Sequence, residues 1–244
     1  MTTILTAVNV VYVLFVSVQF SYLFGAWEGV LPEGSTYADY ARSGFFELIL
    51  VTAINFAILL LSLLALKTAA SKLQIVLRVL LYTLVLCSLV MLYSAFSRLN
   101  LYEEAYGYTQ IRFLVHAFMI FLGLLMLLTA VRISRAQFPL AKCYIVLSLL
   151  SYVLMNYIGM DRIIAAQNIT RYEDSGSLDT AYLANLSWET VPKLIEFSKH
   201  NNGVLDQDLQ EKLSNRGSGY QSWQSFNYAK HHGQQALEAY LREK

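Results

Sequence analysis

The chain has 244 residues, of which 56% are hydrophobic and only 14% are charged, and its mean hydropathy is +0.45. A soluble domain usually has about 25% charged residues, because it must cover its own surface with polar side chains. The composition therefore excludes an ordinary soluble domain, and the net charge of +1 gives no indication of a nucleic-acid partner.

Five continuous apolar runs follow one another along the chain, and each is close to the roughly 20 helical residues that cross a hydrocarbon core. They cover residues 4–24, 46–66, 79–97, 113–131 and 143–160. Membrane β-barrels show shorter, alternating segments instead. No Lys or Arg precedes the first run and no cleavage site follows it, so we expect a retained helix rather than a signal peptide.

Charge separates this apolar block from the rest of the chain. Residues 1–160 hold 9 of the 18 Lys and Arg residues but only 6 of the 17 acidic residues, and residues 161–244 hold the others. We therefore predict an all-α protein. Its transmembrane domain, residues 1–160, is a polytopic membrane helical bundle of about five transmembrane helices. A small helical extramembrane C-terminal segment, residues 161–244, follows.

The basic residues of the connecting loops predict the orientation of the bundle. The connections 67–78 and 132–142 contain six Lys and Arg residues and no acidic residue. Cytoplasmic loops carry such an excess. We thus expect the N-terminus inside and the C-terminal tail outside.

Capping and turn signals divide the tail into short helices. Asn201, Asn202 and Gly203 indicate a turn. The predicted helices are 180–186 after Asp179, 188–200 after Ser187, 207–213 opened by Asp206, and 222–242.

Ionisable residues gather near the predicted outer ends of the second, third and fourth spans. We interpret them as a candidate polar pocket that consists of Glu47, Arg98, Arg112, His116 and Asn55. In it, Glu47 would pair with Arg98 or Arg112, and His116 would carry a proton or orient a ligand. Alternatively, these polar groups bind to one another between helices and stabilise the bundle, or the arginines extend to lipid headgroups.

Other candidate sites are weaker. Glu103 and Glu104 lie among tyrosines in residues 100–110, where we expect a solvated membrane interface. Cys87 and Cys143 are expected to be small apolar side chains rather than metal ligands. No nucleotide-binding, zinc-protease or serine-hydrolase motif occurs, so we expect no cofactor and no metal.

Three stretches resemble a bacterial multi-pass membrane family known as domain of unknown function 4173, which is related to family 4153. They are TYADYARSGFFELILVTAIN (36–55), YSAFSRLNLYEEAYGYTQIRFLVH (93–116) and NYIGMDRIIAAQNITRYEDSGSLDTAYLANLS (156–187). The resemblance implies a bacterial cytoplasmic membrane and a match to the C-terminal half of longer members. It implies no activity, because the family has none established.

The function expected from these features is that of a non-enzymatic sensor, accessory or permease-like component of a bacterial cytoplasmic membrane. The alternative is a membrane-embedded enzyme that acts on a lipid-linked or envelope substrate at the outer leaflet. The expected partners are the lipid bilayer and either another membrane subunit or the missing N-terminal helices.

Overall fold

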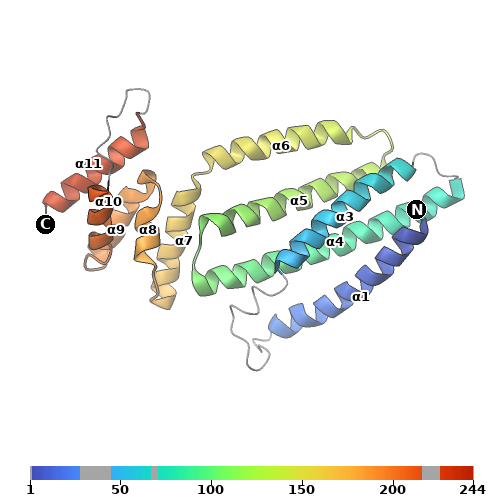
Figure 1. Ribbon diagram of the computed structural model, residues 1–244, viewed down its shortest axis with the longest axis horizontal. Coiled ribbons are helices and arrows are strands. Elements are labelled where there is room, and N and C mark those ends of the chain that lie inside the picture. Colours follow the sequence, from blue (N-terminus) through green and yellow to red (C-terminus); the bar gives the residue numbers. More distant parts are fainter. Residues whose placement is uncertain (1, 28–44, 67–70, 216–225, 244) are drawn as a thin grey trace. The chain divides into compact units, whose positions relative to one another are not determined.

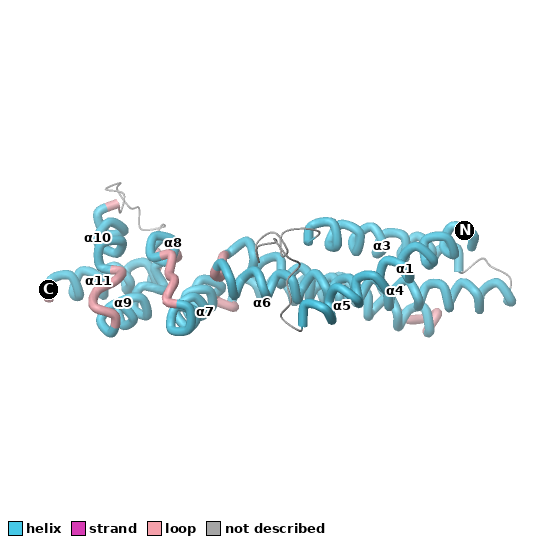
Figure 2. The backbone as a smooth tube through the Cα atoms, turned by 90° about the horizontal axis from the view of Figure 1, so that it is seen from below, coloured by secondary structure: helices cyan, strands magenta, loops and turns pink. Residues whose placement is uncertain are grey.

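A computed structural model of the chain describes residues 2–27, 45–66, 71–215 and 226–243. Every regular element within these ranges is a helix, as the sequence predicts (Figure 2). The chain divides into two compact units. The first contains Met1–Tyr106 and Leu114–Asn156, and the second contains Gly107–Phe113 and Tyr157–Lys244.

The first unit is a bundle of long apolar helices (Figure 1). Its described helices are α1 (Thr2–Trp27), α3 (Phe45–Leu66), α4 (Ser71–Tyr106), α5 (Gln110–Ser134) and α6 (Leu140–Tyr157). Among the described residues, three segments are long and apolar enough to cross a membrane, namely Leu73–Tyr106, Gln110–Ser134 and Leu140–Tyr157. The apolar segments found in α1 and α3, Thr2–Val18 and Ile49–Leu63, are shorter. Three membrane-spanning helices are thus supported, and the count of five stays a prediction.

Helix α4 is the centre of the bundle, because both α1 and α3 pack against it. Leu77, Leu81 and Leu84 recur at helical spacing on one face of α4 and are at most 2% exposed. They form one cluster with Leu5 of α1 and Leu59 of α3. A second cluster joins the later part of α4 to α5 and contains Met91, Leu92, Ala95, Leu99, Met119 and Leu122.

Hydrogen bonds cross between neighbouring helices of the bundle. Such bonds are worth about 0.6–2 kcal/mol each inside a membrane and help to fix the register of the helices. They run from Asn9 Nδ2 to the Leu80 carbonyl (3.1 Å), from Asn55 Nδ2 to Ser88 Oγ (2.9 Å), from the Tyr82 hydroxyl to the Ala130 carbonyl (3.2 Å), and from the Tyr144 hydroxyl to the Leu125 carbonyl (3.2 Å).

Helix α6 has no buried residue. The Tyr144 hydroxyl joins it to α5 through Thr129 and the Leu125 carbonyl. The other apolar side chains of α6 lie largely exposed, among them Ile145, Val146, Leu149, Leu150, Val153 and Leu154. A continuous apolar surface of this kind suits acyl chains or another membrane helix.

The second unit is a cluster of shorter helices around a core of its own. Its elements are α7 (Met160–Ser175), α8 (Thr180–Asn185), the 3-10 helix η1 (Trp188–Thr190), α9 (Val191–His200), α10 (Asp206–Ser214) and α11 (Tyr228–Arg242). The core draws on each α-helix and includes Ile164, Leu183, Leu194, Leu209 and Leu237, all at most 1% exposed.

The predicted caps of these helices are only partly correct. The Asp179 carboxylate accepts from the Tyr182 backbone N–H at 2.9 Å, which confirms the cap of α8. Ser187 makes no side-chain cap, and the segment after it opens as η1 instead. Asp206 is the first residue of α10 and Leu205 occupies the cap position, while Asp206 Oδ1 accepts from Ser198 Oγ at 2.8 Å and from the Tyr240 hydroxyl at 2.7 Å.

Two further predictions concern a turn and the last helix. The turn at residues 201–203 is confirmed, with φ of 54° at Asn202 and 77° at Gly203. Helix α11 begins at Tyr228 rather than at residue 222, and residues 222–225 lie outside the described residues. Gly233 lets α11 approach η1 closely, since a Cβ atom there would lie 2.4 Å from the Trp188 carbonyl oxygen.

Residues 107–109 connect α4 to α5, and together with the first turn of α5 (110–113) they form part of the second unit. Tyr108 and Phe113 pack against its core. The sequence interpretation instead ended the third span at residue 97 and treated residues 100–110 as a solvated loop. That was wrong in part, because α4 continues to Tyr106 with Glu103 buried.

Candidate functional site

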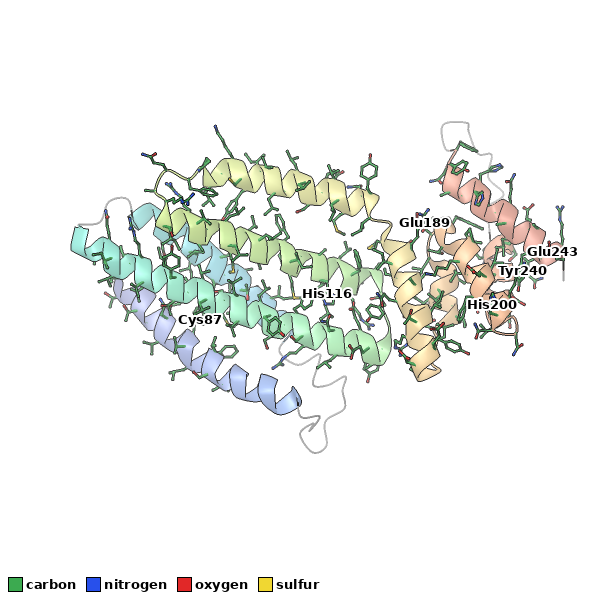
Figure 3. All side chains as sticks on the ribbon, turned by 180° about the vertical axis from the view of Figure 1, so that it is seen from behind. Cys87, His116, Glu189, His200, Tyr240 and Glu243 are labelled. Carbon is green, nitrogen blue, oxygen red and sulfur yellow. The ribbon has the colours of Figure 1, made fainter. Side chains whose placement is uncertain are left out.

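A buried acid–base pair joins α4 to α5 in the first unit. His116 Nδ1 lies 3.4 Å from Glu103 Oε2, and the two side chains are 14% and 5% exposed. The Phe96 ring meets the His116 ring edge to face, with centroids 4.5 Å apart (Figure 3 labels His116). The Nε2 atom of His116 is buried and has no hydrogen-bond partner among the described residues. A histidine in this setting is either a structural lock or a proton site.

The structure distributes the predicted pocket residues over different places. Asn55, on α3, is buried, and its Nδ2 donates to Ser88 Oγ. Arg98 lies half-buried on α4. Arg112 belongs to the second unit and donates to the Gly107 carbonyl, whereas His116 belongs to the first unit. The side chain of Glu47 lies outside the described residues, so its pairing with an arginine stays a prediction.

Glu103 is the residue that the sequence interpretation missed. We expected it to be a solvated interfacial group, yet it is 4% exposed and pairs with His116. The signal that identifies it is helical spacing, because Leu92, Ala95, Leu99 and Glu103 follow one another every three or four residues and all are buried. The buried stripe simply continues past Arg98.

A buried carboxylate organises the second unit. Asp161 Oδ1 accepts from Gln110 Nε2 at 2.7 Å, and its Oδ2 accepts from the Ser187 backbone N–H at 2.9 Å. Burial by itself raises the pKa of Asp161, but the hydrogen bonds from Gln110 and Ser187 and the charge of Lys212 together lower it. The buried carboxylate of Asp161 therefore joins the first residue of α5 to the residue that precedes η1.

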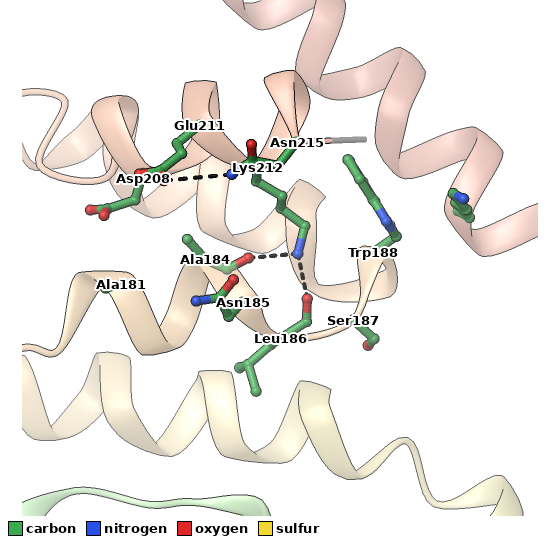
Figure 4. A pocket seen from close by; sticks show the side chains of 11 residues that line it. Ala181, Ala184, Asn185, Leu186, Ser187, Trp188, Asp208, Glu211, Lys212 and Asn215 are labelled. Carbon is green, nitrogen blue, oxygen red and sulfur yellow. Dashed lines mark hydrogen bonds between the residues drawn. The ribbon is translucent and has the colours of Figure 1, made fainter. Parts of the chain in front are cut away.

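Lys212 of α10 lies in a pocket of about 570 Å³ that is lined by residues of α8, η1, α10 and α11 (Figure 4). Its Nζ donates to the Ala184 carbonyl at 2.5 Å and to the Leu186 carbonyl, and lies 4.9 Å from the centroid of the Trp188 ring. Burial lowers the pKa of Lys212, and the negative charge of Asp161 opposes that effect. The ammonium group thus caps the carbonyl end of α8, a role that positive charge favours.

Neither unit shows a metal centre within its described part, where no group of three His, Cys, Asp or Glu side chains could hold an ion. Both cysteines are free thiols. Cys87 is buried in α4, and Cys143 is partly buried in α6.

Three helices able to cross a bilayer, in a chain whose described elements are all helical, define the class as a helical membrane-embedded protein. Residues 1–197 match the family described as "Domain of unknown function (DUF4153)". The chain belongs to that family. The related family 4173, suggested by the sequence resemblance, is not the one that matches. No curated protein and no solved structure matches the chain.

Proposed function

We propose that the chain is a non-enzymatic sensor or accessory component of a bacterial cytoplasmic membrane. A bundle of five spans, with the N-terminus inside, carries the second unit on the outer side as a recognition domain. The excess of basic residues in the connections 67–78 and 132–142 supports this orientation. The exposed apolar face of α6 supports contact with lipid or with another membrane subunit.

The observation that carries the proposal is the way the α4–α5 connection enters the second unit. Asn168 of α7 accepts from the Tyr108 backbone N–H at 2.9 Å and donates to its carbonyl at 2.8 Å. The Tyr182 hydroxyl accepts from the Gln110 backbone N–H at 2.9 Å. A paired side chain of this kind holds the backbone as a neighbouring strand would.

Helix α5 begins at Gln110, whose backbone and side chain are both held by the second unit. A conformational change in the second unit can therefore alter the first turn of α5 directly, with no intermediate segment. Residues Ser187 and Trp188 line the Lys212 pocket, and Asp161 links Ser187 to Gln110. A contiguous network of this kind can couple two sites when the network has two arrangements and a ligand binds one of them more tightly than the other.

The test is hydrogen exchange of the full chain in lipid nanodiscs. Asn168→Ala should raise the exchange rate of the connection 107–109 and of the first turn of α5 (110–113), because the side chain loses two hydrogen bonds to Tyr108 and one to Ile164. Asn201→Ala is the matched control, since among the described residues its side chain bonds to a carbonyl four residues away, that of Phe197. If hydrogen exchange in Asn168→Ala is unchanged, the coupling on which the sensor role depends is contradicted.

One observation favours the alternative of a membrane-embedded enzyme. His116 lies beside Glu103, its buried Nε2 has no hydrogen-bond partner in the described part of the chain, and its imidazole is therefore a candidate acid–base group. In that case each Ala substitution, at His116, Glu103, Arg98 or Arg112, should abolish the effect of the protein on cell growth while the protein stays folded. Loss of detergent stability in the same variants would instead identify them as structural locks.

A further inference from the structure

A second pocket in the second unit combines positive charge with aromatic rings. Its volume is about 550 Å³, and residues of α7, η1, α9 and the start of α11 line it. Small-molecule sites usually have volumes of about 300–1,000 Å³ and a mainly apolar lining with a few polar groups. Ala165, Pro192 and Ala229 supply apolar lining, and Trp188 lines both this pocket and the one around Lys212.

The charged groups of this pocket leave an excess of positive charge. Arg162 Nε pairs with Glu189 Oε2 at 3.4 Å, and the Arg162 side chain is 65% exposed, so most of its N–H groups stay accessible (Figure 3 labels Glu189). Lys193 is exposed and makes no ion pair within the described part of the chain. Glu189 is the one acidic residue among the lining residues.

Two rings stand together at the start of α11. Tyr228 and His232 are stacked, with ring centroids 6.1 Å apart and an interplanar angle of 25°, and both line the pocket. Their spacing of four residues places them on one face of the helix. They offer a flat surface, and the His232 ring adds a hydrogen-bonding nitrogen to it.

We propose that this pocket binds an organic anion in which a phosphate or carboxylate is joined to a flat ring. Lys193 and the accessible N–H groups of Arg162 bind the anionic group, and the ring packs against Tyr228 and His232. The inference rests on the proposed role of the second unit as a recognition domain and names the class of its ligand.

The neighbouring Lys212 pocket is less suited to such a ligand. The ammonium group of Lys212 is already bound by two backbone carbonyls and the Trp188 ring. Asp208 and Glu211 also line that pocket and would repel an anion. The two pockets therefore provide a matched pair of lysines for a test, Lys193 in one and Lys230 in the other.

The experiment measures binding of phenyl phosphate to the full chain in phosphatidylcholine nanodiscs by ligand-observed NMR. Phenyl phosphate should bind more tightly than phenol or inorganic phosphate, because each of these lacks one half of the recognised structure. Lys193→Glu reverses a charge on the exposed surface and should weaken binding about tenfold or more. Lys230→Glu should leave it unchanged. Equal binding to the wild type and Lys193→Glu, or selective loss in Lys230→Glu, overturns the assignment.

A lipid headgroup and a soluble compound are distinguished by the lipid of the disc. If phosphatidylglycerol lowers phenyl phosphate binding to the wild type and not to Lys193→Glu, a lipid phosphate without a ring occupies the site, and the requirement for a flat ring is overturned. Without that competition the ligand is a soluble compound, and the assignment stands. Hydrogen exchange in the same samples tests the sensor role separately. Binding without any change in residues 107–113 would contradict that role and leave the site standing.

Discussion

His116 Nδ1 and Glu103 Oε2 lie 3.4 Å apart across the interface between α4 and α5, with both side chains largely buried. In this bundle, hydrogen bonds between α1 and α4, and between α3 and α4, are made by neutral amides and hydroxyls. The pair therefore places ionisable groups at a helix contact, whereas the Asn9–Leu80 and Asn55–Ser88 contacts use uncharged ones. Its contribution to stability is the first quantity to measure.

Glu103→Gln and His116→Phe should each lower the unfolding temperature in detergent, because the first removes the negative charge that faces His116 and the second leaves the buried Glu103 carboxylate without its partner. The double variant should recover part of the loss, and the cycle should give a coupling of about 1–3 kcal/mol. Glu104→Gln, at the exposed neighbouring position, is the control. Additive effects of the two substitutions would mean that the pair contributes no interaction energy.

Gly233→Ala should destabilise the second unit by about 1–3 kcal/mol, because the added Cβ collides with the Trp188 carbonyl and forces α11 away from η1. Gln235→Ala, an exposed position two residues further along α11, is the control and should be neutral or slightly stabilising. Thermal unfolding followed by tryptophan fluorescence measures the difference. Equal stability of the two variants would contradict the close approach at Gly233.

Acid should weaken the second unit through Asp161. Because the folded-state pKa of Asp161 is lowered, its contribution is fully present above the unfolded pKa of about 3.9 and is lost as the pH falls through the folded value. The wild type should thus lose stability below about pH 4, and Asp161→Asn should show a flatter acid limb and a lower stability at neutral pH. Asp174→Asn, at an exposed position of α7, should keep the acid limb of the wild type.

Orientation can be read from two introduced thiols in a chain whose native Cys87 and Cys143 are replaced by alanine. Ser214→Cys, exposed in α10, should react with a membrane-impermeant maleimide in intact cells. Gln137→Cys, exposed between α5 and α6, should react only after permeabilisation. The reverse pattern would place the second unit in the cytoplasm.

The helical class was predictable because long apolar runs leave few alternatives once β-barrels are excluded. The end of α4 was not, since Arg98, Glu103 and Glu104 look like a loop when polarity alone is considered. Only the pairing of Glu103 with His116, a contact across 13 positions of the chain, explains why an acid is buried there. Local spacing indicates the buried face but not its partner.

Site residues were harder to predict than helices for the same reason. The capping carboxylate of Asp179 acts within its own turn, and its role was foreseen. Asp161 and Asp206 act on residues far away in the sequence, Gln110 and Tyr240 respectively. A sequence pattern over ten or so residues cannot predict such contacts, because they form only when the core packs.

The core of the second unit extends beyond the segment that defines the family. The match ends at Phe197, within α9, while Leu205, Leu209, Leu237 and Tyr240 of the core come from later residues. An expressed fragment cut at residue 197 would therefore expose an apolar face and tend to aggregate. Any attempt to isolate this unit should keep the chain through α11 and include residues 107–113, so the practical boundary of the fold is a matter of packing rather than of sequence similarity.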